Sequence, residues 1–291
     1  MSAASVPGEH VAVRLVGSEL AATLRARSAE VAAELAAGGT PPPKLAVVVA
    51  TEDESSHAYV RSIARAAHKV GLACDIVDLG AGASTPEIQK TLTALGDDDD
   101  VHGTIVQTPL PPGVAAQDVV TSIDPAKDVD GANPSSLGRL ATGLPAFAPA
   151  TAEAVIALLD HHEIELAGKD VVVVGRSTVV GVPVAHLLLA RDASVTVCHS
   201  RTADLAAHTR QADIVIVAAG RPELVTGDHI AARTVVVDVG TNPTDDGGLV
   251  GDVAAAQVGA IAGALTPVPG GVGPVTTALL LWHTVDAARA R

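Results

Sequence analysis

Residues 171 to 183 read VVVVGRSTVVGVP and decide the fold class of this chain. The run Val171 to Val174 is apolar on both faces, as the central strand of a parallel sheet must be. It breaks at Gly175, and a helical pattern from Val184 to Ala190 follows Pro183. A strand that turns through glycines directly into a helix presents backbone N–H groups and the positive helix end to a phosphate.

The strand-to-helix turn gains weight from its surroundings. Its glycine spacing departs from G-x-G-x-x-G, so alone it predicts a dinucleotide site only weakly. Further strand-like runs follow at Val195 to Cys198, Ile214 to Ala218 and Thr234 to Val239, with helix-like sequence between the first pairs. Alternating strands and helices favour parallel pairing through crossovers. We therefore predict a Rossmann-type dinucleotide-binding domain over residues 148–274.

The N-terminal half shows the same alternation. Strand-like and helical segments are expected at residues 9–37 (helix), 44–50 (strand), 55–70 (helix), 73–79 (strand), 85–95 (helix) and 101–107 (strand). Proline and glycine between Asn133 and Pro149 suggest a domain crossing, followed by a connecting helix over 151–161. These patterns predict an α/β domain over residues 1–147, and a last helix over residues 275–290.

Composition restricts the class of protein. With 48% hydrophobic residues but one each of Trp, Tyr and Phe, the core must consist of Ala, Val and Leu. The formal net charge of -14 repels nucleic-acid backbones and anionic lipid. No signal peptide or apolar run of membrane-spanning length is present, so a cytoplasmic protein is expected. Cys74 and Cys198 are interpreted as buried thiols, and no metal site is predicted.

The sequence after the second strand of the C-terminal domain bears on cofactor choice. An NAD enzyme usually places a carboxylate there for the ribose 2′-hydroxyl. Here the residues are His199, Ser200, Arg201 and Thr202. Of these, Ser200 and Arg201, together with Arg176, could accept the 2′-phosphate of NADP, although a simple polar turn is the alternative.

Five motifs occur in order along the chain: Ser56 to Tyr59, Gln107 to Pro111, Lys127 to Gly131, Gly175 to Pro183 and Thr266 to Pro274. In this order they resemble the methylenetetrahydrofolate dehydrogenase/cyclohydrolase family, of the FolD type. Thr108 replaces a usual Leu, and Ala148-Pro149-Ala150-Thr151 replaces the usual Pro-Cys-Thr-Pro crossing. The resemblance implies an N-terminal three-layer α/β folate domain completed by a C-terminal helix over residues 275–291, a Rossmann-type NADP domain, and a homodimer.

The resemblance also implies roles for individual residues. Tyr59 would stack on the pterin and Asp130 would accept hydrogen bonds from its amino-pyrimidine edge. A core tyrosine and a plain Asp-Gly turn are the alternatives. The predicted catalytic positions are Tyr59, Ile63, Gln107 and Asp130. The predicted substrate-binding residues are Ser56, Tyr59, Asp130, Pro269, Gly270 and Gly273. The predicted cofactor-binding residues are Gly175, Arg176, Ser177, Val180, Gly181, Ser200, Arg201 and Thr241.

One position departs from the family pattern in a way that affects chemistry. The family's reactive lysine lies four residues after the tyrosine, where this chain has Ile63. Isoleucine neither donates nor accepts a proton, so cyclohydrolase activity is expected to be weak or absent. A local shift of helix register that brings in Arg61, Arg65 or Lys69 is the alternative.

The sequence thus predicts an NADP-dependent oxidoreductase that converts 5,10-methylenetetrahydrofolate to 5,10-methenyltetrahydrofolate. Two other interpretations stay open. One is a related enzyme with a divergent folate substrate. The other is a non-catalytic protein that binds folate or dinucleotide.

Overall fold

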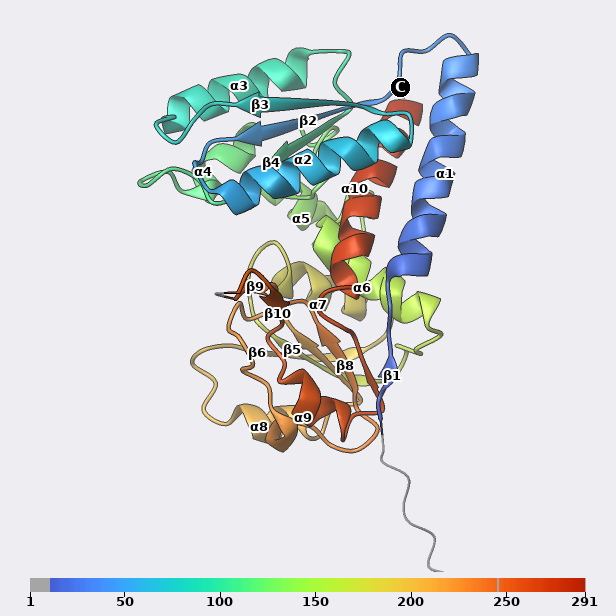
Figure 1. Ribbon diagram of the computed structural model, residues 1–291, viewed down its shortest axis with the longest axis vertical. Coiled ribbons are helices and arrows are strands. Elements are labelled where there is room, and N and C mark those ends of the chain that lie inside the picture. Colours follow the sequence, from blue (N-terminus) through green and yellow to red (C-terminus); the bar gives the residue numbers. More distant parts are fainter. Residues whose placement is uncertain (1–10, 245, 291) are drawn as a thin grey trace, which may run out of the picture. The chain divides into compact units, whose positions relative to one another are not determined.

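The computed structural model describes residues 11–244 and 246–290 and divides into two compact units (Figure 1). Unit 1 comprises the chain up to Gly17 together with Val155–Gly273. Unit 2 comprises Ser18–Ala154 and the chain from Pro274 onward. Helices α6 (Ala150–His161) and α10 (Val272–Arg289) each include residues of both units. The fold is of the α/β class, as predicted.

Unit 1 is built on a parallel sheet with the strand order β1-β11-β8-β7-β5-β6. Its strands are β1 (Val13–Arg14), β5 (Asp170–Val174), β6 (Ser194–Cys198), β7 (Ile214–Val217), β8 (Val235–Asp238) and β11 (Ala264–Leu265). Its other elements are α7 (Gly181–Leu189), α8 (Leu205–Thr209), α9 (Ala255–Gly259), the 3-10 turn η2 (Gly227–His229) and the antiparallel pair β9 (Asn242–Pro243) and β10 (Leu249–Val250).

The order of strands in unit 1 places a switch point beside β5. The chain passes from β5 through α7 to β6 on one side, and then returns to β7 on the other side of β5. In open α/β sheets the carboxyl ends of strands at such a switch form the ligand crevice. The end of β5 is where the sequence places its glycine turn.

Unit 2 contains a parallel sheet with the order β3-β2-β4. Its elements are α1 (Ser18–Ala37), β2 (Lys44–Val49), α2 (Glu54–Lys69), β3 (Ala73–Asp78), α3 (Thr85–Asp97), β4 (Gly103–Val106), α4 (Ala116–Val119), the 3-10 turn η1 (Val120–Ser122) and α5 (Pro134–Ala141). The chain moves from β2 to β3 at one edge of the sheet and then to β4 at the other edge. Because both crossovers are right-handed, α2 and α3 lie on opposite faces of this sheet (Figure 1). The C-terminal helix α10 packs in this unit beside α1, where the Arg27 guanidinium lies 4.0 Å from the centre of the Trp282 ring.

The first predicted helix begins later than expected. The prediction started it at residue 9, and residues 9 and 10 lie outside the described part of the chain. The helix begins at Ser18, and Val13–Arg14 pairs with Ala264–Leu265 instead. The amides of Ala12, Val13 and Leu15 donate at 2.9, 2.9 and 3.0 Å to carbonyls at the end of α9, just before β11 and in β11, which are those of Gly259, Gly263 and Leu265. Tertiary hydrogen bonds to a sheet edge therefore override the helical spacing, and the segment joins unit 1 rather than the N-terminal domain.

A second element was not predicted. The proline- and glycine-containing stretch interpreted as a crossing includes α5. The Asn133 side chain caps this helix by accepting from the Ser135 amide, and Pro134 occupies its first turn. Both are ordinary helix-start signals. None of the described helices is long and apolar enough to cross a membrane.

Candidate functional site

The turn after β5 in unit 1 is closed by contact between two glycine backbones. A Cβ on Gly181 would lie 2.3 Å from the carbonyl oxygen of Gly175, and one on Gly175 would lie 2.1 Å from the carbonyl oxygen of Ala218. Gly175 also has a φ of +133°, which L side chains rarely adopt. The five residues between the glycines thus form a tight loop that leads straight into α7. Although the glycine spacing departs from G-x-G-x-x-G, the chain still passes from strand through a tight turn into a helix.

The polar residues predicted for the cofactor lie at neighbouring strand ends. Val174 of β5 pairs with Cys198 of β6, so Arg176 and Ser200 each stand two residues beyond the same point of the ladder. Both side chains are exposed, as are those of Arg201 and Thr241. The Ser177 hydroxyl is used inside the turn, where it accepts from the amides of residues 180 and 181 at 3.2 and 3.4 Å. Close-approach glycines and exposed cations fit a phosphorylated dinucleotide.

One buried carboxylate in unit 1 ties three strand-end segments together. Asp252 accepts hydrogen bonds from the amides of Ala219, Gly220 and Arg221 at 2.7, 2.8 and 2.9 Å. It also accepts from the Asn242 side chain at 2.9 Å. The loop after β7 and the segment after β8 are therefore held in fixed positions at the edge where the glycine turn lies. This residue has no motif signal, and sequence reasoning missed it.

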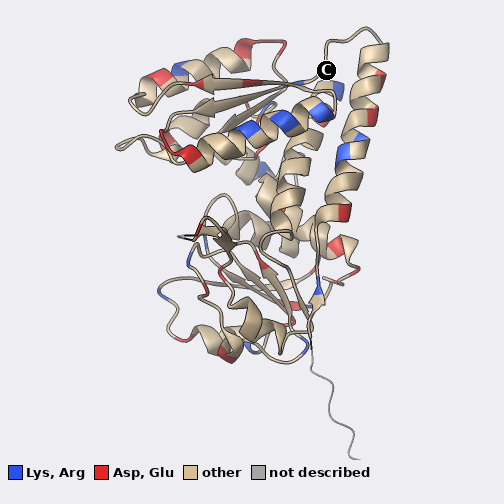
Figure 2. Ribbon diagram, viewed as in Figure 1, with Lys and Arg blue, Asp and Glu red and all other residues tan. Residues whose placement is uncertain are grey.

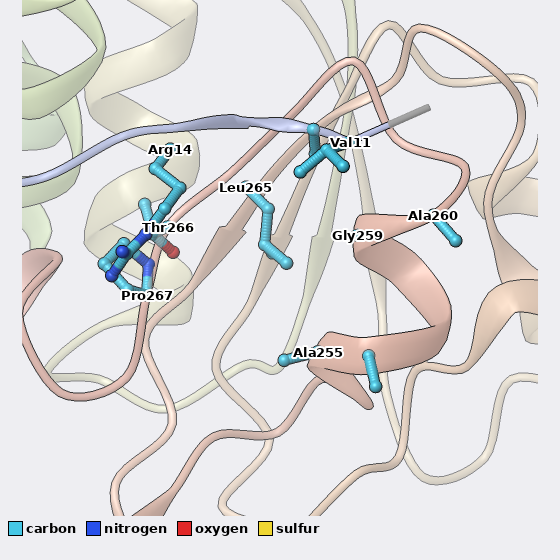
Figure 3. A pocket seen from close by; sticks show the side chains of 10 residues that line it. Val11, Arg14, Ala255, Gly259, Ala260, Leu265, Thr266 and Pro267 are labelled. Carbon is cyan, nitrogen blue, oxygen red and sulfur yellow. The ribbon is translucent and has the colours of Figure 1, made fainter. Parts of the chain in front are cut away.

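A cavity of about 580 Å³ in unit 1 is lined by other residues (Figure 3). It opens between β1 and α9 and is mostly apolar, with Arg14 as its cation. None of the predicted site residues lines it. The lining residues are Val11, Ala12, Arg14, Ala255, Ala256, Gly259, Ala260, Leu265, Thr266 and Pro267.

The terminal motif residues Pro269, Gly270 and Gly273 belong to unit 1. Gly270 has a φ of +111°, and its carbonyl accepts from the Gly17 amide at 2.9 Å. The backbone here therefore requires glycine for a local reason. Contact of this segment with folate stays a prediction.

In unit 2 the helix α2 begins at a serine-rich cap. The Asp53 carboxylate accepts from the Ser56 amide at 2.8 Å and from the Ser56 hydroxyl at 2.7 Å. Hydrogen bonds from Ser55 and Ser56 lower the pKa of Asp53 to about 2. The Ser56 hydroxyl also approaches the Thr108 carbonyl at 3.3 Å. Ser56 thus fixes the start of α2 against the segment that follows β4.

Tyr59 and Asp130 are brought together, with a residue from α10 that sequence reasoning missed. Desolvation raises the pKa of Tyr59, a hydrogen bond with the Thr277 side chain opposes that rise, and the charge of Asp130 adds to it. The Tyr59 side chain is nevertheless 39% exposed. That exposure contradicts the alternative of a core tyrosine. It leaves an aromatic face available for stacking.

Ile63 lies one turn beyond Tyr59 and is fully buried. It shares the inner face of α2 with Ser56, Val60 and Ala67. The helix runs without interruption from Glu54 to Lys69. A regular helix leaves the spacing from Tyr59 to Ile63 intact.

The basic residues of α2 are directed elsewhere. Arg61 pairs with Glu54 at 2.7 Å, and Arg65 and Lys69 are exposed. Figure 2 shows the basic positions spread along this helix. A shifted register that brings one of these cations to the position of Ile63 therefore finds no support.

Gln107 stands directly after β4, and its backbone N–H donates to the carbonyl of Val48 in β2 at 2.9 Å. Its side-chain Nε2 donates to the Thr108 carbonyl at 2.6 Å. The side chain is thereby oriented by its own neighbour, with Nε2 as the end that is engaged.

In the Lys127 to Gly131 loop most residues have structural roles, and Asp130 is partly exposed. Lys127 is 1% exposed, and its ammonium donates to the carbonyls of Leu95 and Asp98 at 3.0 and 2.7 Å. It thus caps the C-terminus of α3. A Cβ on Gly131 would lie 2.5 Å from the Pro149 nitrogen, and its φ is +59°. This glycine is therefore required by close backbone packing.

Asp128 in the same loop is also structural. Its carboxylate accepts from the amides of Ala132 and Asn133 at 2.9 and 2.8 Å and from the Ser136 hydroxyl at 2.6 Å. It therefore fixes the chain that leads into α5.

Asp130 differs from its neighbours in the loop because its side chain is only half-buried. Desolvation and the charge of Asp128 raise its pKa to about 6, against the opposing effects of the Ala150 amide and His283. The carboxylate is therefore ionised at neutral pH and can accept paired N–H donors from a ligand.

Among residues 11–244 and 246–290, no group of three or more His, Cys, Asp or Glu side chains could hold a metal ion. Cys198 is buried and Cys74 is half-buried, and both are free thiols.

Two family models match the chain. The catalytic domain of tetrahydrofolate dehydrogenase/cyclohydrolase matches residues 15–130, and the NAD(P)-binding domain of the same family matches residues 149–291. These matches cover the loop of Asp130 and the glycine turn, respectively.

Individual relatives agree with the family models. "Bifunctional protein FolD 1" of Saccharopolyspora erythraea is 65% identical over 274 residues, which is 94% of this chain and 93% of that protein. The crystal structure of the FolD dehydrogenase/cyclohydrolase of Campylobacter jejuni superposes with a TM-score of 0.93 at 40% identity, covering 96% of this chain and 99% of that one. That of Trypanosoma brucei FolD, complexed with NADP cofactor and an inhibitor, gives 0.91 at 36% identity, with 98% and 99% covered. The chain therefore belongs to the tetrahydrofolate dehydrogenase/cyclohydrolase family.

Proposed function

We propose that this protein oxidises 5,10-methylenetetrahydrofolate to 5,10-methenyltetrahydrofolate with NADP, and that it hydrolyses the methenyl product slowly or not at all. The observation that carries the second part is the buried Ile63 on an uninterrupted α2. The two relatives at 65% identity are named bifunctional, and the Campylobacter jejuni structure carries both activities in its name. The proposal departs from those names at this one position.

The oxidation step makes modest demands on side chains. NADP, when bound, accepts the hydride that leaves the methylene carbon. The chain has to hold the folate in place, and positioning of this kind supplies most of the catalysis. The exposed ring of Tyr59 offers a stacking surface, and the ionised Asp130 offers an acceptor for the pterin edge.

Hydrolysis of the methenyl product makes different demands. Water must add to the methenyl carbon, so a proton has to leave the water and another has to reach a folate nitrogen. A positioned acid/base is needed for both transfers. Ile63 supplies none, and the raised pKa of Tyr59 makes its phenol a poor source of phenolate at neutral pH.

A paired assay on one enzyme preparation tests this proposal. NADP reduction with methylenetetrahydrofolate should be rapid. Loss of added methenyltetrahydrofolate should stay close to its spontaneous rate. A panel of other folates separates a divergent substrate from this one, and absence of hydride transfer with every folate would favour a non-catalytic binding protein.

The polar residues at the β5 and β6 ends support NADP over NAD. Arg176→Ala should raise the Michaelis constant for NADP by about tenfold or more, because a charge-assisted hydrogen bond contributes about 1.5–3 kcal/mol. The constant for NAD should barely change. Steady-state kinetics with both cofactors measure the two effects. Arg191→Ala is the matched control, since Arg191 pairs with Asp160 at 2.7 Å. Equal losses with both cofactors would contradict the assignment of Arg176 to the 2′-phosphate.

The pKa of Asp130 predicts a pH dependence for folate binding. Its value of about 6 lies above the ordinary value of 3.8, so the carboxylate gains a proton as the pH falls through about 6. Folate affinity should therefore fall below that pH, by up to about tenfold per pH unit. Calorimetric titration with tetrahydrofolate at a series of pH values measures this. Asp130→Asn should bind more weakly with a flat profile. A profile that Asp130→Asn leaves unchanged would assign the titration to another group.

A homodimer through unit 1 is part of the proposal. Strand β6 is an edge of the six-stranded sheet, and its Val197 is 40% exposed. Light scattering on the purified protein tests this.

A further inference from the structure

A buried histidine of α10 lies behind the Lys127 to Gly131 loop in unit 2. His283 is 3% exposed. Its Nδ1 lies 2.8 Å from the Val129 carbonyl oxygen and its Nε2 lies 3.0 Å from Oε2 of Glu153 in α6. The Phe147 ring packs against the imidazole with ring centres 5.0 Å apart. The histidine thus joins three segments of the chain.

Both ring nitrogens of His283 face hydrogen-bond acceptors. A neutral imidazole carries one N–H and can satisfy only one of them. An imidazolium donates to both, and Glu153 then supplies the matching negative charge. Burial lowers the pKa of His283, but the hydrogen bond and charge of Glu153, the Val129 carbonyl and the charge of Asp130 outweigh this effect and raise it overall. The geometry and the charges around the ring both favour the protonated form.

The lysine that adjoins the two aspartates in sequence is engaged by carbonyls at the end of α3. The Lys127 ammonium is directed into α3, where it donates to the carbonyls of Leu95 and Asp98. The charges that act on Asp130 are Asp128, which raises its pKa, and His283, which lowers it. His283 also lowers the pKa of Asp128. The imidazolium therefore places a positive charge next to both aspartates of this loop.

We propose that His283, charged and held by Glu153, is the positioning residue for Asp130: it fixes the backbone at Val129 and keeps the Asp130 carboxylate ionised for the folate pterin. This inference rests on the proposed role of Asp130 in folate binding. It assigns to α10 and α6 a function in substrate affinity, although neither His283 nor Glu153 touches the substrate.

The pair of His283 and Glu153 also borders a cavity that connects it with solvent. His283 and Glu153 line a cavity of about 580 Å³, together with Phe147, Arg139 of α5 and Asp286 of α10. Protons therefore have access to the pair. Because the pKa of His283 is raised, its charge is complete at low pH and is lost as the pH rises through that pKa. Support for Asp130 should weaken in the same direction.

His283→Gln tests the proposal. Glutamine keeps one donor but carries no charge and cannot bridge both acceptors. The Michaelis constant for folate should rise about tenfold, the lower end of the loss in metal affinity or activity when the hydrogen-bond partners of metal ligands are removed. The turnover number should stay within about twofold, because the groups next to the reacting carbon are unchanged. The acid limb of folate binding should move to higher pH, because Asp130 loses its neighbouring cation. A purely structural loss would not shift that limb.

Glu153→Gln is the second variant, and it decides the matter if His283→Gln does not fold. Its amide oxygen still accepts from His283, but without the negative charge of Glu153 the pKa of His283 falls and less of the imidazole is charged. The acid limb of folate binding should therefore move in the same direction as in His283→Gln, by a smaller amount. His208→Gln, on the exposed side of α8, is the control and should match the unmodified protein. An unchanged folate constant and an unchanged acid limb in folded Glu153→Gln and His283→Gln would overturn the proposal.

A readout without folate separates this inference from the proposed function. Hydrogen exchange of the amides in residues 127–133 should speed up in His283→Gln, and NMR titration should show His283 still charged at neutral pH in the unmodified protein. If the unmodified protein binds no folate, the proposed function fails, while these two measurements still test whether His283 holds the loop. Unchanged hydrogen exchange in His283→Gln, together with a neutral His283 in the unmodified protein, would refute the proposal that His283 holds the loop.

Discussion

Ile63→Lys should raise the rate of methenyltetrahydrofolate hydrolysis by about 10² to 10⁴, the contribution of a positioned acid/base. The substituted side chain would start from the inner face of an uninterrupted α2, one turn beyond Tyr59. Burial lowers the pKa of a lysine toward neutrality, which suits a group that must both donate and accept a proton. Hydride transfer to NADP should change little. The measurement is the decay of methenyltetrahydrofolate against the spontaneous rate.

Two controls accompany this variant. Ile63→Met adds length without a charge and should leave hydrolysis at the level of the unmodified protein. In Ile63→Lys with Gln107→Met, the gain should shrink, because the double variant lacks the Gln107 side chain that we expect to orient the new ammonium. Thermal unfolding shows whether the buried ammonium has destabilised unit 2. If the unmodified protein already hydrolyses the methenyl compound rapidly, and a folate-site ligand blocks it, another group performs the proton transfers and the argument from Ile63 fails.

Gly181→Ala should weaken NADP binding by about 100-fold or more, which corresponds to about 2.7 kcal/mol. The added Cβ would lie 2.3 Å from the Gly175 carbonyl oxygen and 2.6 Å from its carbon. These are backbone atoms of a turn whose other side already meets Ala218, so the turn must open. The helix gains up to about 1 kcal/mol from alanine over glycine, which is too little to compensate. Calorimetry with NADP measures the loss.

Gly138→Ala provides the matched control for this substitution. Gly138 lies inside α5 of unit 2, and nothing lies within 4 Å of the position of its Cβ. Alanine there should stabilise the helix slightly and leave binding of both ligands unchanged. A folded Gly181→Ala protein with normal NADP affinity would show that the glycine turn does not carry the phosphates.

Much of the fold follows from local patterns in the sequence. The valine runs of β5, β7 and β8 and the apolar spacing of α2 are strong because each element is buried against a sheet over most of its length. The extent of β1 could not be predicted, because its two residues form a strand only through hydrogen bonds to β11, which lies far along the chain. The helix α5 was missed even though Asn133 and Pro134 carry local start signals, because proline and glycine near it suggested a linker.

The candidate site likewise contains residues that local motifs identify and residues whose roles depend on distant contacts. Motifs identified Tyr59 and Asp130, which the fold brings into electrostatic contact. Thr277, Glu153 and His283 escaped notice because their roles depend on how α10 and α6 pack against the loop, and single residues on helices leave no spacing signal. Both ring nitrogens of His283 face acceptors that lie far from it in the sequence. Asp252 was missed for a similar reason, since its partners are backbone amides of remote segments.

The division of labour inside the Lys127 to Gly131 loop bears on how such a protein diverges. Lys127, Asp128 and Gly131 are held by the α3 terminus, the start of α5 and the backbone near Pro149, so selection for a folded chain alone maintains them. Asp130 accepts from the Ala150 amide and is the partly exposed member for which we propose a ligand. A descendant that abandoned folate should keep these three residues and be free to change at Asp130. In related chains we therefore expect Lys127, Asp128 and Gly131 to be needed for the fold, and Asp130 to be needed for the folate binding proposed above.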